Sequence, residues 1–493
     1  MNNAPKPASV FAASAACAGW GCTIATAASW ATLPIGVRLG VLRRARHAMA
    51  ARPEVFARAI STHLARTEAD TLVTELLPLL AACKFLEKNA ERLLRTRKLG
   101  LSGRPIWLGG VYAEVHHDPL GQVLIIGPAN YPLFPPGVQV LQALAAGNHV
   151  TWKPGAGGRE VAECMAEALR EAGLPEGILR ITEDTVEAAR EALASGADKV
   201  IFTGSAETGR AVLRGLAETA TPAVMELSGA DAVVVLPRAN LETVAKSLAF
   251  GLRLNGGAVC MSPRRLFAEA NTMRALRPLL LRELEAIPPV ELSAAMGASL
   301  RRLVDEAVAS GASPTGEVDT AAQRPLLIED ATVGMAVTRA DIFAPVLSLI
   351  TLRSMLELPE AYAACSYGLT VSIFCAGNEE RKARSLAHTL RAGTVLINDL
   401  IAPTVDPRVP FGGMGASGFG TTRGAEGLLE MTATKTLLVR RGGAMRHLQP
   451  TRHEDTSVFV HLIRVLHGRT WGERWLGLRE VFKGRAALGN RNQ

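Results

Sequence analysis

Short apolar runs alternate with longer Ala-rich segments through the first half of the chain. The apolar runs lie at residues 123–126, 149–152, 200–202 and 232–236. The segments 159–172 and 185–195 repeat apolar residues at three-and-four spacing, which is typical of amphipathic helices. Strands that alternate with helices predict β-α-β units around a parallel sheet. The fold class is therefore α/β, and a doubly wound sheet of this kind binds ligands at the carboxyl ends of its strands.

The pattern changes on either side of this region. Residues 35–97 have the periodicity of helices, and residues 112–117 predict a strand in an arm or hairpin outside the main sheet. From about residue 228 to residue 400 the alternation of apolar runs and helical segments resumes. We therefore expect a second α/β domain after the first.

Length and composition agree with a large folded protein. At 493 residues the chain is several times an ordinary domain of roughly 100–150 residues, so two or three domains are expected. Hydrophobic residues make up 48% and charged residues 20%, as in folded α/β proteins. The seven cysteines are scattered, without CxxC or Cys/His ligand spacing. We predict no disulfide framework, no metal site and a cytoplasmic, reducing location.

Residues 8–37 contain no charged side chain. They are rich in Ala, Ser, Thr and Gly rather than Leu and Ile, so they match a signal peptide or a membrane span of roughly 20 residues poorly. We expect an Ala-rich helix packed on the body instead.

The positive charge of the chain is concentrated at its end. The net charge is +8, and residues 440–493 contain eleven Lys or Arg and four Asp or Glu, which gives +7 for this segment alone. Because the remainder is close to neutral, no nucleic-acid partner is predicted.

Cys260 and Glu226 are the first candidates for chemistry. Cys260 follows Gly256 and Gly257, which allow close approach of the backbone, and Glu226 lies 34 residues upstream (260 − 226). A thiol that can be acylated and a carboxylate that can activate water are the minimum apparatus for oxidising an aldehyde to an acid. The alternatives are a buried small hydrophobe for the cysteine and a surface carboxylate for the glutamate.

The setting of Glu226 favours a catalytic group. Apolar residues precede it, so we expect it at a strand end, where partial burial raises its pKa toward the range useful for a general base. Asn130 follows an apolar strand, and its amide is either a donor to a developing alkoxide or the cap of the next helix. Spacing alone leaves these two roles open.

A second group of residues suggests a nucleotide site. Gly204, Ser205 and Gly209 follow a strand and begin a helix, where free backbone N–H groups suit a pyrophosphate. Lys153 ends another strand and brings a cation near ribose or phosphate. The glycine pattern is not GxGxxG, so the signal is weak by itself.

Together, short motifs in matching order resemble the aldehyde dehydrogenase superfamily from about Trp30 to Thr436. They are PLG (119–121), GPANYP (127–132), AAGN (145–148), KP (153–154), FTGS (202–205), ELSG (226–229), NGGAVC (255–260), IFAPV (342–346) and PFGG (410–413). The resemblance implies a Rossmann-like dinucleotide domain at residues 1–103 and 121–227 and an α/β catalytic domain at 228–424. It also implies a small β oligomerisation arm at 104–120 and 425–440, followed by a basic amphipathic extension at 441–493.

By the same resemblance, Cys260 is the nucleophile that attacks the aldehyde and Glu226 is the base that activates water to hydrolyse the thioester. Asn130 and the backbone N–H of Cys260 form the oxyanion hole. Asp341 stands where the family has a glutamate that holds the nicotinamide ribose, and Phe343 lies beside it. Other departures from the family pattern are Ala129, Ser228, Ala258 and Ala344.

The cofactor implied is NADP or NAD. Three residues after Lys153 the family often has a glutamate that grips the adenosine ribose, and here the residue is Ala156. Without that carboxylate a 2′-phosphate meets no repulsion, so the sequence predicts that NADP is accepted at least as readily as NAD.

Several alternatives stay open. A CoA-acylating dehydrogenase is the nearest rival, although Glu226 speaks against it, and an idle scaffold relative is another. The substrate class favoured is an aliphatic, lipid-derived aldehyde, and the assembly expected is a homodimer or homotetramer. The C-terminal extension interleaves apolar residues with arginines, which suits either an anionic membrane surface or a neighbouring subunit.

Overall fold

The computed structural model describes residues 30–61, 64, 66–442, 445–448, 450–453 and 455–489. The predicted Ala-rich helix therefore lies mostly outside the described residues, since residues 1–29 are not among them. Contacts within the chain divide it into two compact units. The first unit is Met1–Thr96 with His116–Lys435, and the second is Arg97–Val115 with Thr436–Gln493. Each unit is described by itself below.

The first unit contains a six-stranded sheet in the order β17-β7-β6-β3-β4-β5. The strands are β3 (Gln122–Ile126), β4 (His149–Lys153), β5 (Leu179–Ile181), β6 (Lys199–Gly204), β7 (Ala223–Leu227) and β17 (Gly418–Phe419). All neighbours are parallel except β17, which runs antiparallel to β7. The runs predicted at 123–126, 149–152 and 200–202 are confirmed as β3, β4 and β6.

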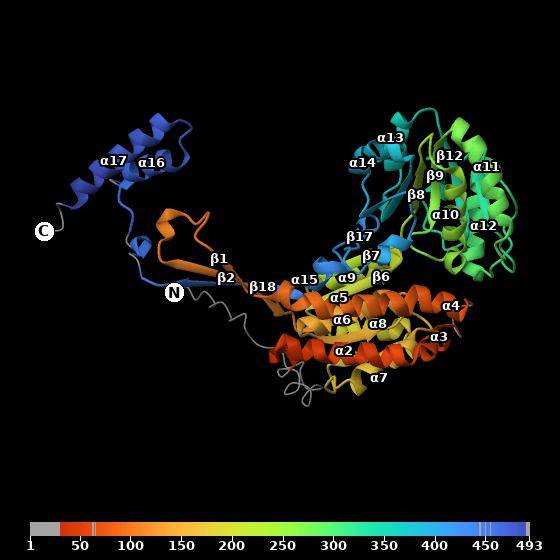
Figure 1. Cartoon of the computed structure of the whole chain (residues 1–493), viewed down its shortest axis with the longest axis horizontal. Helices are drawn as coiled ribbons and strands as arrows, with labels where there is room; N and C mark the ends of the chain where they lie inside the picture. The colour runs from red at the N-terminus through yellow and green to blue at the C-terminus, as the bar shows by residue number, and fades with distance from the viewer. Residues whose placement is uncertain are drawn as a thin grey trace, which may run out of the picture. The chain divides into compact units, whose positions relative to one another are not determined.

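Helices cover both faces of this sheet. The elements are α2 (Ile35–Ala51), α3 (Pro53–Ser61), α4 (Glu68–Thr71), η1 (Leu72–Leu76), α5 (Leu77–Leu94), α6 (Phe134–Ala146), α7 (Arg159–Glu171), α8 (Val186–Ala194) and α9 (Ala206–Ala217). Helices α2, α5, α6 and α7 are labelled in Figure 1. Val123 and Ile125 belong to one core cluster with residues of α2, α5, α6 and α7, whereas Leu124 and Ile126 belong to another with residues of α8 and α9. This alternation follows from the two-residue period of a strand, and it identifies a doubly wound layer.

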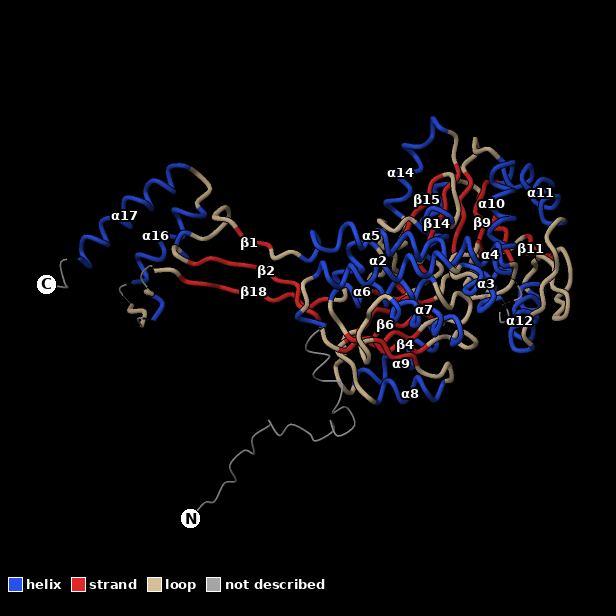
Figure 2. Tube along the Cα trace, turned by 60° about the horizontal axis from the view of Figure 1, so that its bottom comes forward, coloured by secondary structure: helices blue, strands red, loops and turns tan. Residues whose placement is uncertain are grey.

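A second, seven-stranded sheet in the same unit has the order β10-β11-β12-β9-β8-β14-β15. Its strands are β8 (Asp231–Val235), β9 (Pro263–Glu269), β10 (Ser313–Pro314), β11 (Leu326–Glu329), β12 (Val346–Leu352), β14 (Thr370–Phe374) and β15 (Thr394–Ile397). The helices around it are α10 (Leu241–Arg253), α11 (Ala270–Glu285), α12 (Ala294–Ala309), α13 (Leu358–Ala363) and α14 (Glu380–Thr389). The strands of both sheets are drawn in red in Figure 2. The predicted α/β fold class is thus confirmed, with both sheets in the same compact unit.

The run at 232–236 belongs to this second sheet, as β8, and not to the first. The chain later returns to the first sheet, because β17 pairs with β7 so that Gly418 lies opposite Glu226. The intervening short elements are η3 (Leu254–Gly257), η4 (Ala336–Thr338), η5 (Met355–Glu357), β13 (Tyr367–Gly368), η6 (Gly377–Glu379), η7 (Ala402–Val405), β16 (Met414–Gly415) and α15 (Gly424–Leu429). This return brings residues 417–424 against the strand that carries Glu226.

Outside these two sheets, the strand predicted at 112–117 is confirmed as β2 (Val111–Pro119), the middle strand of the sheet β1-β2-β18. Its neighbours are β1 (Arg97–Leu99) and β18 (Thr432–Arg440). After η8 (Arg446–Leu448), helices α16 (Asp455–His467) and α17 (Trp471–Gly489) form a hairpin. A Cβ on Gly477 would lie 2.8 Å from the His461 carbonyl oxygen, so this glycine allows the two helices to cross closely. Within the described residues, no helix has both the length and the apolar character that a membrane crossing requires.

Candidate active site

Cys260 follows a tight loop at the end of α10. Asn255, Gly256 and Gly257 in η3 have φ angles of 49°, 60° and 76°, so three successive residues adopt the left-handed conformation. A Cβ on Gly257 would lie 2.7 Å from the carbonyl carbon and oxygen of Ala344, so only glycine fits there. The loop therefore leaves the helix abruptly and presents Cys260, half-buried, against the core of the second sheet.

Two asparagines hold this loop. The Asn130 side-chain amide donates to the Ala258 carbonyl at 2.9 Å, and the Asn255 amide donates to the same carbonyl at 3.1 Å and to the Asn130 carbonyl at 3.2 Å. Asn130 does not cap α6, whose first N–H groups bond instead to the buried Glu75 carboxylate. The helix-cap alternative for Asn130 is thereby removed. The Asn130 amide has two N–H groups, and the bond to the Ala258 carbonyl uses one of them.

Glu226 lies in β7 and is buried, as expected for a strand end. Its carboxylate accepts from the Thr422 hydroxyl at 3.0 Å and from the Gln139 amide at 3.5 Å. Burial raises the pKa of Glu226, while the charge of Arg423 and the Thr422 hydrogen bond oppose the rise. The Glu226 motif also touches the nucleophile loop, since a Cβ on Gly229 would lie 2.9 Å from the Cys260 carbonyl oxygen.

Burial raises the pKa of the Cys260 thiol, and the charges of Glu226 and Asp231 raise it further, whereas Arg423 lowers it. Charges act on one another in this way only at short range. The structure therefore brings Cys260, Glu226 and Asn130 together, as the sequence predicted, and adds Asp231 and Arg423 to the cluster.

Arg423 is a buried guanidinium that the sequence did not single out. Its Nη1 donates to the Thr404 carbonyl at 2.8 Å, and its centre lies 4.0 Å from the Phe411 ring and 5.4 Å from the Phe134 ring. Burial lowers the pKa of Arg423, and the charges of Glu226 and Cys260 raise it.

Arg264 is a second buried cation beside the nucleophile loop. It donates through Nη1 to the Ala344 carbonyl and through Nη2 to the Gly257 carbonyl, each at 2.5 Å. Burial lowers the pKa of Arg264 to about 10. This side chain ties the Cys260 loop to the segment that precedes β12. No sequence signal distinguishes Arg264 from the chain's many other arginines.

The predicted cofactor residues occupy the carboxyl edge of the first sheet. Lys153 ends β4 and is buried, which lowers its pKa, while the charge of Asp184 opposes this shift. Ser205 caps α9 by accepting from the Thr208 N–H at 3.2 Å, and Gly204 ends β6 directly before it. An ammonium and the start of a helix at one sheet edge fit a dinucleotide phosphate.

Gly209 has a different position from the one expected. Its N–H donates within α9 to the Ser205 carbonyl at 2.9 Å, so that N–H is already used. A Cβ on Gly209 would lie 2.6 Å from Leu227, so the glycine lets α9 pack closely on β7. Gly209 thus supports the site through packing.

Asp341 and Phe343 lie half-buried in the segment before β12. Burial raises the pKa of Asp341, and a hydrogen bond with the Ser228 side chain and the charge of Arg264 lower it. Two departures from the family pattern, Ser228 and Asp341, are therefore partners in the structure. Asp341 also raises the pKa of Cys260, which puts it within electrostatic range of the thiol.

A cavity of about 510 Å³ lies elsewhere in the first unit, between α8 and the sheet. It is lined by residues of β3 and β4 and by residues 180–183, 188, 191–192 and 195–196, and not by Cys260 or Glu226. Among the residues that the structure describes, no cluster of His, Cys, Asp or Glu is suited to hold a metal ion.

Comparison with known proteins places the chain in a family. Residues 9–437 match the aldehyde dehydrogenase family. The chain is 31% identical over 393 residues to 4,4′-diapolycopene aldehyde oxidase of Methylomonas sp, covering 78% of this chain and 73% of that protein. It is 27% identical over 432 residues to a putative succinate-semialdehyde dehydrogenase (NADP+) of Mycolicibacterium smegmatis, covering 84% and 82% of the two chains. The crystal structure of an NAD-dependent aldehyde dehydrogenase from Sinorhizobium meliloti superposes with a TM-score of 0.78 at 25% identity, covering 84% and 85%.

The protein has one α/β sheet of the dinucleotide-binding type and a second that carries the Cys260 loop. It is an oxidoreductase that works with NAD or NADP. The chain belongs to the aldehyde dehydrogenase family.

Proposed function

We propose that the protein oxidises an aldehyde to a carboxylic acid through a thioester on Cys260, with water activated by Glu226. The observation that carries the proposal is the buried cluster in which the Glu226 motif and Asn130 both contact the Cys260 loop. A bound nicotinamide supplies the hydride acceptor. Every other step falls to side chains of this chain.

In the first step, the Cys260 thiol proton passes to Glu226, whose charge acts on the thiol, while the sulfur forms a bond to the aldehyde carbon and the carbonyl oxygen becomes an alkoxide. Glu226 then releases this proton to solvent, so that it is a base again for the second step. The remaining N–H of the Asn130 amide and the Cys260 backbone N–H are the proposed donors to that oxygen. One such donor contributes about 3 kcal/mol to the transition state. Loss of hydride from the carbon then leaves a thioester.

In the second step, Glu226 takes a proton from water, the water oxygen bonds to the acyl carbon, and the carbon–sulfur bond breaks. The carboxylic acid leaves, and Cys260 recovers a proton. Burial raises the pKa of Glu226, which suits this role because a carboxylate with a raised pKa is the stronger base.

Arg423 has a role in both steps. Glu226 is buried and Cys260 is half-buried, and the charge of Glu226 raises the pKa of the thiol, so a negative charge on one group disfavours a negative charge on the other. We assign Arg423 as the cation that balances this charge, because the charges that act on it are those of Glu226 and Cys260.

The experiment is a panel of aldehydes assayed with NAD and with NADP, with and without CoA, against Cys260→Ala as the blank. The expected product is the free acid, formed without CoA by the native enzyme and absent with C260A. A product formed only with CoA would instead make the protein an acylating dehydrogenase. Failure of every aldehyde with both cofactors would favour an idle relative.

The substrate class we favour is a long apolar aldehyde. The proposal is supported by the 31% identity to a diapolycopene aldehyde oxidase, whereas the identity to the succinate-semialdehyde enzyme is 27%. We expect kcat/KM for a long-chain alkanal to exceed that for succinate semialdehyde. The reverse order in the same panel would contradict this substrate class.

We further propose a cytoplasmic homodimer or homotetramer that assembles through the three-stranded sheet β1-β2-β18. Exposed apolar side chains on and beside this sheet support the proposal. They are Leu99, Leu101, Trp107, Leu437 and Leu438. Light scattering coupled to size exclusion measures the assembly, and a monomeric mass at micromolar concentration would contradict it.

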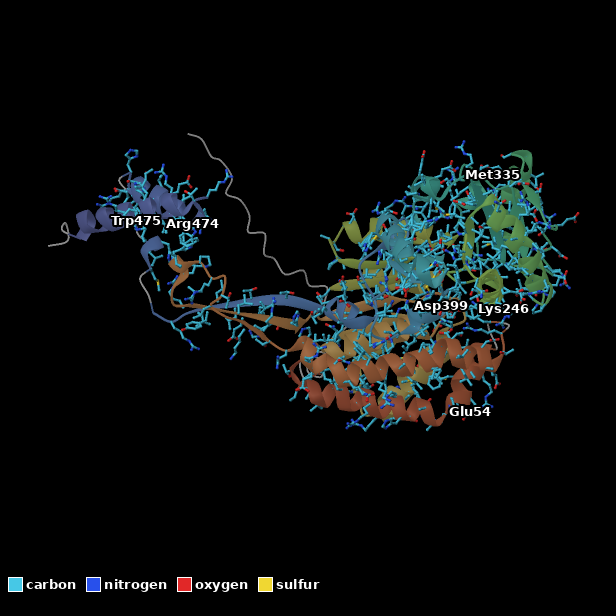
Figure 3. The ribbon with its side chains drawn as sticks, turned by 45° about the horizontal axis from the view of Figure 1, so that its top comes forward. Glu54, Lys246, Met335, Asp399, Arg474 and Trp475 are labelled. Atoms are coloured by element: carbon cyan, nitrogen blue, oxygen red, sulfur yellow. The ribbon has the colours of Figure 1, made fainter. Side chains whose placement is uncertain are left out.

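For the hairpin α16–α17, we propose contact with an anionic membrane surface. Its exposed apolar side chains include Trp471 and Trp475 at i,i+4 spacing, and Arg474 lies between them in the sequence. Arg474 and Trp475 are labelled in Figure 3. Tryptophan and arginine on one helix suit the headgroup region of a bilayer. A contact between two copies of the hairpin would instead bring their arginines together, which like-charge repulsion disfavours.

The test compares sedimentation with vesicles of phosphatidylcholine alone and with phosphatidylglycerol added. The full chain is expected to bind only the anionic vesicles, and the double variant Trp471→Ser with Trp475→Ser to lose this binding. Both side chains are exposed, so folding is not at risk. Absence of vesicle binding, together with a smaller assembly for the variant, would assign the hairpin to a subunit contact instead.

A further inference from the structure

Asp184 lies beside the cofactor lysine, in the loop that follows β5. Strand β5 is the neighbour of β4, so the loop after β5 and Lys153 at the end of β4 share one edge of the sheet. The Asp184 carboxylate accepts from the Gly157 N–H at 2.6 Å. Its charge acts on the Lys153 ammonium. A half-buried carboxylate is therefore fixed within electrostatic range of the lysine.

The hydrogen bond gives Asp184 a specific place in the site. Gly157 directly follows Ala156, the position at which the sequence lacks the expected carboxylate. Gly157 has a φ of 73°, a conformation that favours glycine and that turns the chain after β4. Position 156 has no carboxylate, but the loop after β5 places the Asp184 carboxylate beside it. The N–H of Gly157, one residue after Ala156, holds that carboxylate by a hydrogen bond.

We propose that Asp184 accepts hydrogen bonds from the unphosphorylated hydroxyls of the adenosine ribose, and that the enzyme therefore prefers NAD to NADP. This inference rests on the proposed location of the dinucleotide at the edge formed by Lys153 and Ser205. An ionised carboxylate has about four acceptor sites, and the Gly157 N–H uses one of them. The others suit a vicinal diol, whereas a 2′-phosphate would bring two like charges together.

A neighbouring charge agrees with this preference. Arg159 is the first residue of α7 and forms an ion pair with Glu183, the residue directly before Asp184. That guanidinium therefore already has a carboxylate partner.

This conclusion reverses the preference predicted from Ala156 alone. That prediction considered only the residue three positions after Lys153, which is Ala156 and has no carboxylate. Sequence spacing does not reveal that a residue 28 positions after Ala156 (184 − 156) bonds to the backbone beside it.

The experiment measures dissociation constants of NAD and NADP by calorimetry on the full chain, without aldehyde. The native protein is expected to bind NAD at least about tenfold more tightly than NADP, the order of effect that one repelled charge produces at a partly buried site. Asp184→Asn retains an acceptor for the Gly157 N–H. This variant is expected to bind NAD more weakly and NADP more tightly than the native protein does. The ratio of the NADP dissociation constant to the NAD dissociation constant should fall to about one or below.

Glu187→Gln is the matched control, because it removes one exposed carboxylate from the same helix region and is expected to keep the native ratio. A native protein that binds NADP as tightly as NAD would overturn the proposal without any variant. An unchanged ratio in D184N would overturn it as well. If the native protein binds neither dinucleotide, the proposed cofactor site itself is rejected. If D184N and E187Q both lose binding of NAD and of NADP, the defect is general, and this outcome counts against a specific role for Asp184.

Discussion

Arg423 has a φ of 61°, yet it carries a long side chain into the buried site. Left-handed backbone at a residue other than glycine costs free energy, on the order of 1 kcal/mol. The neighbouring Thr422 hydroxyl donates to Glu226, so the strained segment delivers both a hydrogen bond and a charge to the same cluster. Strain retained beside reactive groups is consistent with a functional demand at this position.

Arg423→Gln tests the role of this charge. Removal of the cation is expected to raise the pKa of Cys260, because Arg423 lowers it in the native protein. The pH midpoint for alkylation of Cys260 by iodoacetamide should therefore move upward. Peptide mass spectrometry separates Cys260 from the other thiols, and no substrate is needed.

Arg423→Lys keeps the charge and is expected to keep the native midpoint. The exposed pair of Arg408 and Asp406 offers a control, since Arg408→Gln removes a cation far less buried than Arg423 and should leave the midpoint unchanged. A folded R423Q with the native midpoint, or an R423K that shifts as far as R423Q, would show that the charge does not act on the thiol.

Asp231 gives a prediction on pH dependence. It accepts from the Thr370 N–H at 3.1 Å and from the Thr370 hydroxyl, and burial raises its pKa from 3.8 to about 7. A raised carboxyl pKa means that the folded state binds the proton more tightly than the unfolded state. The stability from this group is therefore present below the unfolded pKa and lost as the pH rises through about 7.

Asp231→Asn cannot ionise and should not lose this stability. We expect the Tm of D231N to rise relative to that of the native protein as the pH increases from about 4 to about 8. The full effect is at most about 4 kcal/mol, at about 1.4 kcal/mol for each pKa unit. Differential scanning calorimetry across that range measures it, and parallel Tm curves would mean that Asp231 is not the titrating group.

The sequence identified some residues of the site and missed others for a physical reason. Cys260, Glu226 and Asn130 lie in short motifs whose local geometry their own neighbours determine. Arg423 and Asp184 act through space on groups far away in the chain, and nothing in their immediate neighbourhood distinguishes them. Long-range electrostatic partners of this kind become visible only once the fold is known.

At the scale of elements, the proposed chemistry depends on the loop between α10 and β9, which carries Cys260. Three left-handed residues in succession are costly for side chains with a Cβ, which explains two adjacent glycines. Arg264 completes the loop by bonding to the Gly257 and Ala344 carbonyls. The position of Cys260 is therefore set by backbone geometry as much as by side-chain packing.

Gly257→Ala tests this geometry. The new Cβ would lie 2.7 Å from the Ala344 carbonyl, and the φ of 76° would be strained. We expect at least a tenfold loss of kcat/KM together with a lower Tm, on the order of 1–3 kcal/mol in stability.

Gly215→Ala is the matched control, because Gly215 lies in α9 with no atom within 4 Å of an added Cβ. Alanine stabilises a helix by about 0.5–1 kcal/mol relative to glycine, so Tm should rise slightly with activity unchanged. Native kcat/KM in G257A would contradict the claim that this loop positions the nucleophile.

Strand prediction succeeded where apolar runs were long. β3, β4 and β6 stand out in the sequence because each contains a run of buried apolar residues. β5 has only three residues, so it lacks the continuous apolar pattern that identifies a buried strand. β7 was expected only as the strand end that carries Glu226, and the structure continues it by one residue to Leu227.

At the scale of the whole molecule, the run at 232–236 fitted two predictions, because it ended the first alternation of strands and helices and also lay inside the second region from about residue 228. Periodicity reports whether a strand is buried and not which sheet it joins, and the structure places this run, as β8, in the second sheet. The return of residues 417–424 to the first sheet was equally hidden, because β17 has only two residues. That return places Thr422 against Glu226 and so completes the site.

The central claim is that Cys260 becomes acylated during turnover and that Glu226 releases the acyl group. Intact and peptide mass spectrometry of Glu226→Gln, quenched during reaction with an aldehyde and NAD or NADP, tests it most directly. The account predicts an acyl mass on Cys260 that accumulates in E226Q and is absent from Cys260→Ala. An unmodified Cys260 in E226Q, together with acid production by C260A, would contradict the account.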